Sequence, residues 1–253
     1  MKQRMWTKAI AALIGCAALA GVDVTTAQQA TPPSAAVEPE AIAALDRMGA
    51  YLRTLRVFSL RSETTIDEVT DDGMKLQFGG TVTMQVQRPS GLRVEVDSDR
   101  KRRRLIYDGK TVTVYGERVG YYATVPAPAT LEELDADLDS KYGIRLPLAD
   151  LYRWGSAGST RAATREAAVI GPSKCGNAVC DHVAVRQEGV DWQIWIERGR
   201  TPLPRKLVIT TLSEPSQPQY VALMHWDVAP KFDATTFRFK APMGAHRIPL
   251  VGG

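Results

Sequence analysis

Hydrophobic residues first recur at helical spacing along this chain and then switch to alternation. Between about Glu40 and Leu55 the apolar positions lie three or four residues apart, which predicts an amphipathic helix with one buried stripe. That stripe consists of Ile42, Leu45, Met48, Leu52 and Leu55. From Val57 onward the period is two, which is typical of strands that bury one face.

Turn signals divide the alternating region into neighbouring strands. They are Asp71-Asp72-Gly73, Asp97-Ser98-Asp99 and the strong hairpin signal Asp108-Gly109. Gly79-Gly80 lies inside one apolar alternation and predicts a bulge or bend. Together these signals predict a meander of antiparallel strands that reaches Val125.

Helical signals return in the middle of the chain. Thr130 and Glu133 form a capping box ahead of three leucines on one face, and a short helical piece follows Pro147. Strands resume after Gly155, with 167–170, 183–186, 192–196, 206–211 and 220–228 as the best candidates. We therefore expect a mainly β fold with helices (α+β), in which a strongly curved antiparallel sheet forms a half-open β-barrel closed by the N-terminal helix and the inserted helices.

The N-terminus is predicted to direct export. Residues 1–27 combine basic positions, an apolar run over 9–20 and small residues before Gln28, as a secretory signal peptide does. The run is shorter than the roughly 20 residues of a spanning helix, so no transmembrane span is expected in the mature protein. Leu13-Ile14-Gly15-Cys16 also resembles a lipobox, which leaves a lipid anchor at Cys16 open. Residues 28–39, rich in proline and small residues, predict a disordered leader before a single domain over 40–253.

Charge and cysteine content restrict the partners. Loss of the signal peptide lowers the basic and acidic counts from 32 and 28 to 29 and 27, and this near-neutral balance argues against nucleic acid. Cys175 and Cys180 flank Gly176-Asn177, which predicts a disulfide that closes a hairpin in an exported protein. With His182 they would make an incomplete ligand set, so no metal site is expected.

The sequence holds little that indicates catalysis. His182, His225 and His246 lie far apart, and the glycines and serines of residues 155–159 have the wrong spacing for a nucleophile elbow. Glu132 and Glu133 stand at a helix start, where carboxylates complement the helix dipole. We expect neither an enzyme nor a cofactor.

Two stretches resemble the periplasmic lipoprotein carrier (LolA/LolB-like) superfamily. They are residues 88–96 with 105–115, and residues 232–245 with Phe237-Arg238-Phe239 ahead of Pro242-Met243-Gly244. The order of elements, with Pro147-Leu148-Ala149-Asp150-Leu151 after a helix, is most similar to a family of predicted periplasmic proteins of unknown function in that superfamily. The resemblance implies a half-open barrel with a helical lid over an apolar cavity, and a Phe-x-Phe strand that closes the chain.

The inward-facing apolar positions predict either a ligand cavity or a packed core. The candidate cavity residues are Phe58, Leu60, Met74, Leu76, Phe78, Met84, Val94, Val96, Val112, Val114, Trp192, Met224 and Trp226. The resemblance favours a periplasmic, non-enzymatic protein that holds an acyl chain, a lipid or a lipoprotein-type apolar ligand. The alternative is an envelope protein-interaction or sensing module, which a filled barrel would favour.

A run of five cations forms the other candidate site: Arg100, Lys101, Arg102, Arg103 and Arg104. Such a run could contact anionic headgroups, phosphates or an acidic envelope partner. It could equally be a solvated strand edge whose charges prevent edge-to-edge association.

Overall fold

The computed structural model describes residues 36–155 and 159–250. The predicted signal peptide, Cys16 and most of the predicted leader lie outside them. The elements are α1 (Pro39–Thr54), β1 (Val57–Val69), β2 (Lys75–Gln87), β3 (Gly91–Ser98), β4 (Arg102–Tyr107), β5 (Thr111–Gly116), β6 (Tyr121–Pro126), α2 (Leu131–Tyr142), α3 (Ala149–Arg153), a 3₁₀ turn (Thr160–Ala163), β7 (Glu166–Cys175), β8 (Ala178–Gln187), β9 (Val190–Glu197), β10 (Pro204–Thr211), β11 (Gln219–Asp227) and β12 (His246–Arg247).

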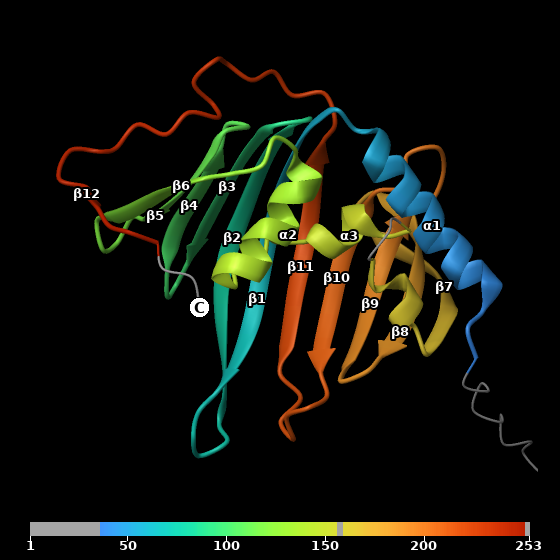
Figure 1. The fold of residues 1–253 in the computed structure, drawn as a ribbon. Helices are drawn as coiled ribbons and strands as arrows, with labels where there is room; N and C mark the ends of the chain where they lie inside the picture. The colour runs from blue at the N-terminus through green and yellow to red at the C-terminus, as the bar shows by residue number, and fades with distance from the viewer. Residues whose placement is uncertain (1–35, 156–158, 251–253) are drawn as a thin grey trace, which may run out of the picture. The chain divides into compact units, whose positions relative to one another are not determined.

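The strands form one curved, open sheet with helices on one face. Its order is β12-β6-β5-β4-β3-β2-β1-β11-β10-β9-β8-β7, so β1 joins the N-terminal meander to the C-terminal one (Figure 1). The mainly β fold class and the helical cover are as predicted, although the sheet does not close into a barrel. One pairing departs from the antiparallel expectation, because β12 runs parallel to β6.

Strand register separates the two faces of the sheet. Leu60 pairs with Met84, which pairs with Val94, and all three are buried against the helices on what we call the inner face. The ladder between β1 and β2 continues through Gly79 and Gly80 without a shift, so the expected bulge is wrong. A Cβ on Gly80 would lie 2.8 Å from the Cβ of Ser98, and the glycine therefore permits close contact between β2 and β3.

The helices begin and end where local chemistry favours it. Pro39 stands in the first turn of α1, and the Thr130 hydroxyl accepts a hydrogen bond from the Glu133 amide at the start of α2. Gly143 ends α2 in a left-handed conformation with φ of 61°. The folded chain starts earlier than Glu40, because Val37 forms a parallel bridge with Ala167 on β7.

The C-terminal segment is not the strand that the resemblance implied. Residues 232–245 are irregular and cross the outer face, where the Phe239 ring lies 5.0 Å from Tyr122 and 5.9 Å from Tyr115. The Phe237 ring reaches Gly91 so closely that a Cβ there would be 3.0 Å from it. The paired phenylalanines therefore anchor an irregular strap rather than extend the sheet.

Candidate functional site

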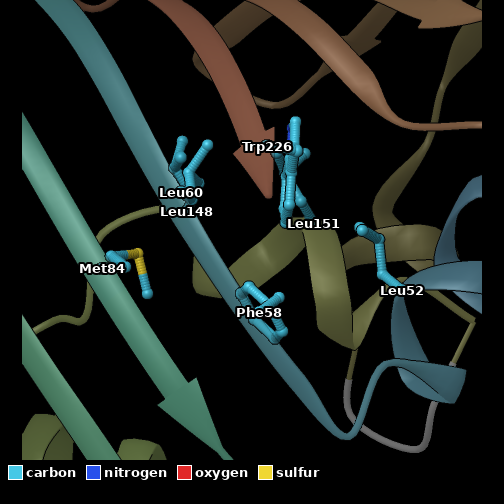
Figure 2. A pocket seen from close by; sticks show the side chains of 7 residues that line it. All are labelled: Leu52, Phe58, Leu60, Met84, Leu148, Leu151 and Trp226. Atoms are coloured by element: carbon cyan, nitrogen blue, oxygen red, sulfur yellow. The ribbon is translucent and has the colours of Figure 1, made fainter. Parts of the chain in front are cut away.

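Beneath the helices lies a small apolar cavity of about 10 Å³, roughly the size needed for one water molecule. Figure 2 shows side chains from α1, β1, β2, β11 and the α3 region converging on it. They are Leu52, Phe58, Leu60, Met84, Leu148, Leu151 and Trp226. The concave interior is therefore largely filled by the protein's own side chains.

The predicted cavity residues fall into three groups. Four of them border the small cavity: Phe58, Leu60, Met84 and Trp226. Others are buried in the surrounding core, namely Val94, Val112, Trp192 and Met224. The remaining five, Met74, Leu76, Phe78, Val96 and Val114, are only partly covered or exposed. Met74 and Leu76 do not lie inside, since their exposed fractions are 55% and 38%.

Sequence reasoning missed the lid side of the cavity. Leu148 precedes α3 with a positive φ of 58°, which is unusual for a bulky residue, and both Leu148 and Leu151 reach the cavity. The motif around Pro147 had marked a short helix, but its role as the cavity's cover depends on tertiary packing. Leu52 on α1 completes that side.

A polar clamp fastens α3 to α1. Asp46 accepts a hydrogen bond from Trp154 Nε1 at 3.1 Å, and an Arg53 guanidinium N–H donates to the Trp154 carbonyl. Gly49 permits this approach, because a Cβ there would be 2.5 Å from the Trp154 carbonyl oxygen. Arg153 ties the other side of α3 to Asp135 of α2 at 2.6 Å.

The hydroxyl of Ser62 is the exceptional polar group on the inner face. Its side chain is fully buried between Leu60 and Thr64 along β1, opposite Val82 and Met224. Its oxygen has no hydrogen-bond partner among the described residues. Buried hydroxyls are nearly always bonded, so this atom needs an explanation.

Burial falls along the inner face as the strands leave the helical cover. On β1 it passes from buried Phe58 and Leu60 to Ile66, which is 47% exposed. On β2 it passes from buried Met84 to half-buried Phe78 and exposed Leu76. We call the partly covered inner-face set of Ile66, Leu76, Phe78, Val96 and Val114 the open strip.

The basic run is divided by strand alternation. Arg102 and Arg104 point to the outer face, where they pair with Asp97 at 2.8 Å and Glu95 at 3.0 Å. Arg103 lies opposite Val96 and therefore on the inner face. Arg100 places its guanidinium 4.9 Å from the Phe78 ring centroid and 3.5 Å from a Glu68 oxygen. The five cations thus do not form one patch.

Cys175, Cys180 and His182 have structural partners. Cys175 and Cys180 form a disulfide, as the hairpin spacing predicted. His182 stacks on Trp195 with centroids 4.0 Å apart and contacts Gln193 at 3.0 Å.

In the ranges that the structure describes, no helix is long and apolar enough to cross a membrane.

The solved structures that align with this chain are distant from it in sequence. An uncharacterized conserved protein from Thermus thermophilus matches with TM-score 0.46 and 11% identity, over 83% of this chain and 99% of the other. The Mycobacterium tuberculosis lipoprotein LppX matches with TM-score 0.46 and 10% identity, over 78% and 100%. The MucA/MucB complex of Pseudomonas aeruginosa contains a chain with TM-score 0.42 and 15% identity, over 80% of this chain and 62% of the other.

No curated protein matches the sequence. A family model described as a predicted periplasmic protein (DUF2092) matches residues 41–251, which include every helix and strand of the structure except the first two residues of α1. This is the kind of family that the arrangement of turns and strands had indicated. The chain belongs to the DUF2092 family of predicted periplasmic proteins.

Proposed function

We propose that the protein is a periplasmic, non-enzymatic binding protein that holds an acyl chain or a similar apolar ligand against the inner face of its sheet. The open strip carries this proposal. Apolar side chains continue from the covered core to Ile66 and Leu76, which face solvent at the distal end of the β1–β2 hairpin. An exposed extension of a core face is a typical feature of an interaction site.

A bound chain would extend from the open strip toward the small cavity beneath α3. The cavity of about 10 Å³ cannot hold an acyl chain, so binding requires α3 to move away from the sheet. The short length of α3 permits such movement, because a helix of five residues has little stability of its own. Each buried methylene contributes about 0.8 kcal/mol, which would offset the displacement.

Ser62 supports the same route. Its unpaired hydroxyl lies one inward position beyond Leu60, which borders the cavity, and it is followed on the same face by Thr64. Gly80 and Ala222 flank Thr64 on the adjacent strands, so the side chains beside it are small. The methylenes of such a ligand cannot bond to Ser62, but an ester or carboxyl oxygen at the end of its chain would supply the hydrogen-bond partner that the described residues do not provide.

A neutral fluorescent fatty-acid methyl ester tests the proposal. We expect the purified protein to bind it, and Ile66→Asp to weaken binding roughly tenfold because a carboxylate would be placed against the chain. Val179→Asp is the matched control, since Val179 is 50% exposed on β8, away from the open strip. The proposal fails if the wild-type protein does not bind the ester, or if both variants weaken binding equally.

A second candidate function is an envelope protein-interaction or sensing module with a permanently packed interior. The filled interior favours it, because the cavity beneath the helices is no larger than a water site. In that case the ester would not bind at all. The ester titration therefore separates the two functions.

A further inference from the structure

We propose that the ligand of the open strip carries an anionic headgroup, and that Arg103 is the residue that binds it. This inference rests on the proposed function and names the class of ligand: a lipid with an acyl chain and a negatively charged head. The inference depends on strand alternation. Arg103 is the cation of the basic run that lies in a strand and faces the inner side of the sheet.

The position of Arg103 follows from the ladder. Arg103 pairs with Val96, which pairs with Val82, and Val82 pairs with Ser62. Directly opposed residues share a face, so all four side chains lie on the inner face. Arg103 is therefore an exposed cation in the row that contains the unpaired hydroxyl of Ser62, and the row continues beyond it to Gly116 and Tyr121.

Arg103 lacks the partners that its neighbours have. Among the residues that the structure describes, no carboxylate or hydrogen-bond acceptor is joined to its side chain, whereas Arg102 and Arg104 are held by Asp97 and Glu95. Its partner on β5 is Gly116, where a Cβ would lie 2.8 Å from a methyl group of Val119, so this position contributes no polar side-chain partner. An exposed guanidinium beside half-buried Val96 suits a ligand with an apolar chain and an anionic head.

Nearby carboxylates do not cancel this charge. The acidic helix α2 lies over the inner face, but four of its carboxylates are engaged by cations: Glu132 with Arg88, Asp135 with Arg153, Asp137 with Lys141 and Asp139 with Arg145. Its fifth, Glu133, belongs to the capping box with Thr130. Glu68, on the inner face of the hairpin, is engaged by Arg100.

Two probes and two variants test the inference. The probes are a fluorescent fatty acid, ionised at about pH 8, and its neutral methyl ester. The variants are Arg103→Glu and Arg61→Glu, which change the net charge equally. Arg61 is also an exposed strand arginine, but it lies on the outer face of β1, one position after Leu60.

We expect Arg103→Glu to weaken binding of the fatty acid at least tenfold and to leave binding of the ester unchanged. Arg61→Glu should affect neither probe by more than about twofold, and added salt should weaken only the binding of the fatty acid to the wild-type protein. Equal loss in both variants, or equal loss of both probes in Arg103→Glu, would overturn the inference while leaving the proposed function intact. Absence of ester binding to the wild-type protein would overturn the proposed function, and this inference with it.

Discussion

At the scale of single residues, the buried hydroxyls of Ser62 and Thr113 can be compared directly. The Thr113 hydroxyl bonds the Thr124 hydroxyl at 2.8 Å, whereas the Ser62 hydroxyl lies in an apolar setting with no partner in the described chain. A buried polar group left unbonded destabilises a protein by about 1–3 kcal/mol. The unbonded hydroxyl of Ser62 is therefore expected to lower the stability of the protein by an amount in this range.

We predict that Ser62→Ala leaves the free energy of unfolding unchanged or raises it by up to about 1 kcal/mol, measured by urea denaturation without ligand. Thr113→Val is the control and should lower it by about 0.5–1.5 kcal/mol, because it removes a made hydrogen bond. If Ser62→Ala were as destabilising as Thr113→Val, the hydroxyl would have a partner in the folded protein and would not be reserved for a ligand.

Alternation predicts which face of a strand a side chain occupies but not how deeply the side chain is buried. Phe58, Leu60 and Met84 were predicted to line the interior and do border the cavity. Leu76 shares their face and is exposed, because the hairpin extends beyond the helical cover. A period of two reports the face of a strand, while the extent of the cover depends on packing of distant segments. The left-handed conformation of Leu148 is likewise invisible in a pattern of apolar positions.

At the scale of elements, α1 was predictable from its apolar spacing and α2 from its capping box, whereas the C-terminal strap was not predictable. Its alternating phenylalanines fit a strand pattern equally well. The Asp233 carboxylate, however, accepts hydrogen bonds from the Thr235 amide at 2.7 Å and the Thr235 hydroxyl at 2.6 Å. Such local bonds compete with a strand ladder, and the rings then pack on the outer face instead.

We predict that Phe239→Ala lowers the free energy of unfolding by about 1–3 kcal/mol, since the half-buried ring loses its contacts with Tyr115 and Tyr122. Met243→Ala in the same strap is the control, because Met243 is fully exposed and should change stability by less than about 0.5 kcal/mol. Equal effects of the two substitutions in chemical denaturation would show that the strap is held by something other than its aromatic anchors.

At the scale of the whole molecule, the sheet is open and a short stretch of each edge is paired. Residues at the start of the folded chain add a bridge to β7, and β12 pairs with β6 at the other edge. Covered edges resist association through strand pairing. The surface to which we assign the proposed ligand is the inner face, where the helical cover ends and the open strip begins.

If the interior must open to bind a ligand, as we propose, a change that destabilises the closed form should lower the stability of the protein and raise its affinity for the ligand. The clamp at Asp46 holds the Trp154 indole and Arg161, and so keeps α3 on the sheet. A ligand that needs α3 displaced binds with an apparent affinity reduced by the fraction of molecules that are open. Loosening the clamp should raise that fraction.

We therefore predict that Asp46→Ala lowers the free energy of unfolding by about 1 kcal/mol and tightens binding of the neutral ester by up to about fivefold. Asp191→Ala is the control: it removes the same charge from the Arg186 pair on β8 and β9, away from α3, and should not change binding. Calorimetry or fluorescence titration of both variants against the same ester gives the comparison. Weaker or unchanged ester binding in Asp46→Ala would contradict a ligand route beneath α3. If the ester bound neither the variant nor the wild-type protein, the packed interaction module would be the better account of the fold.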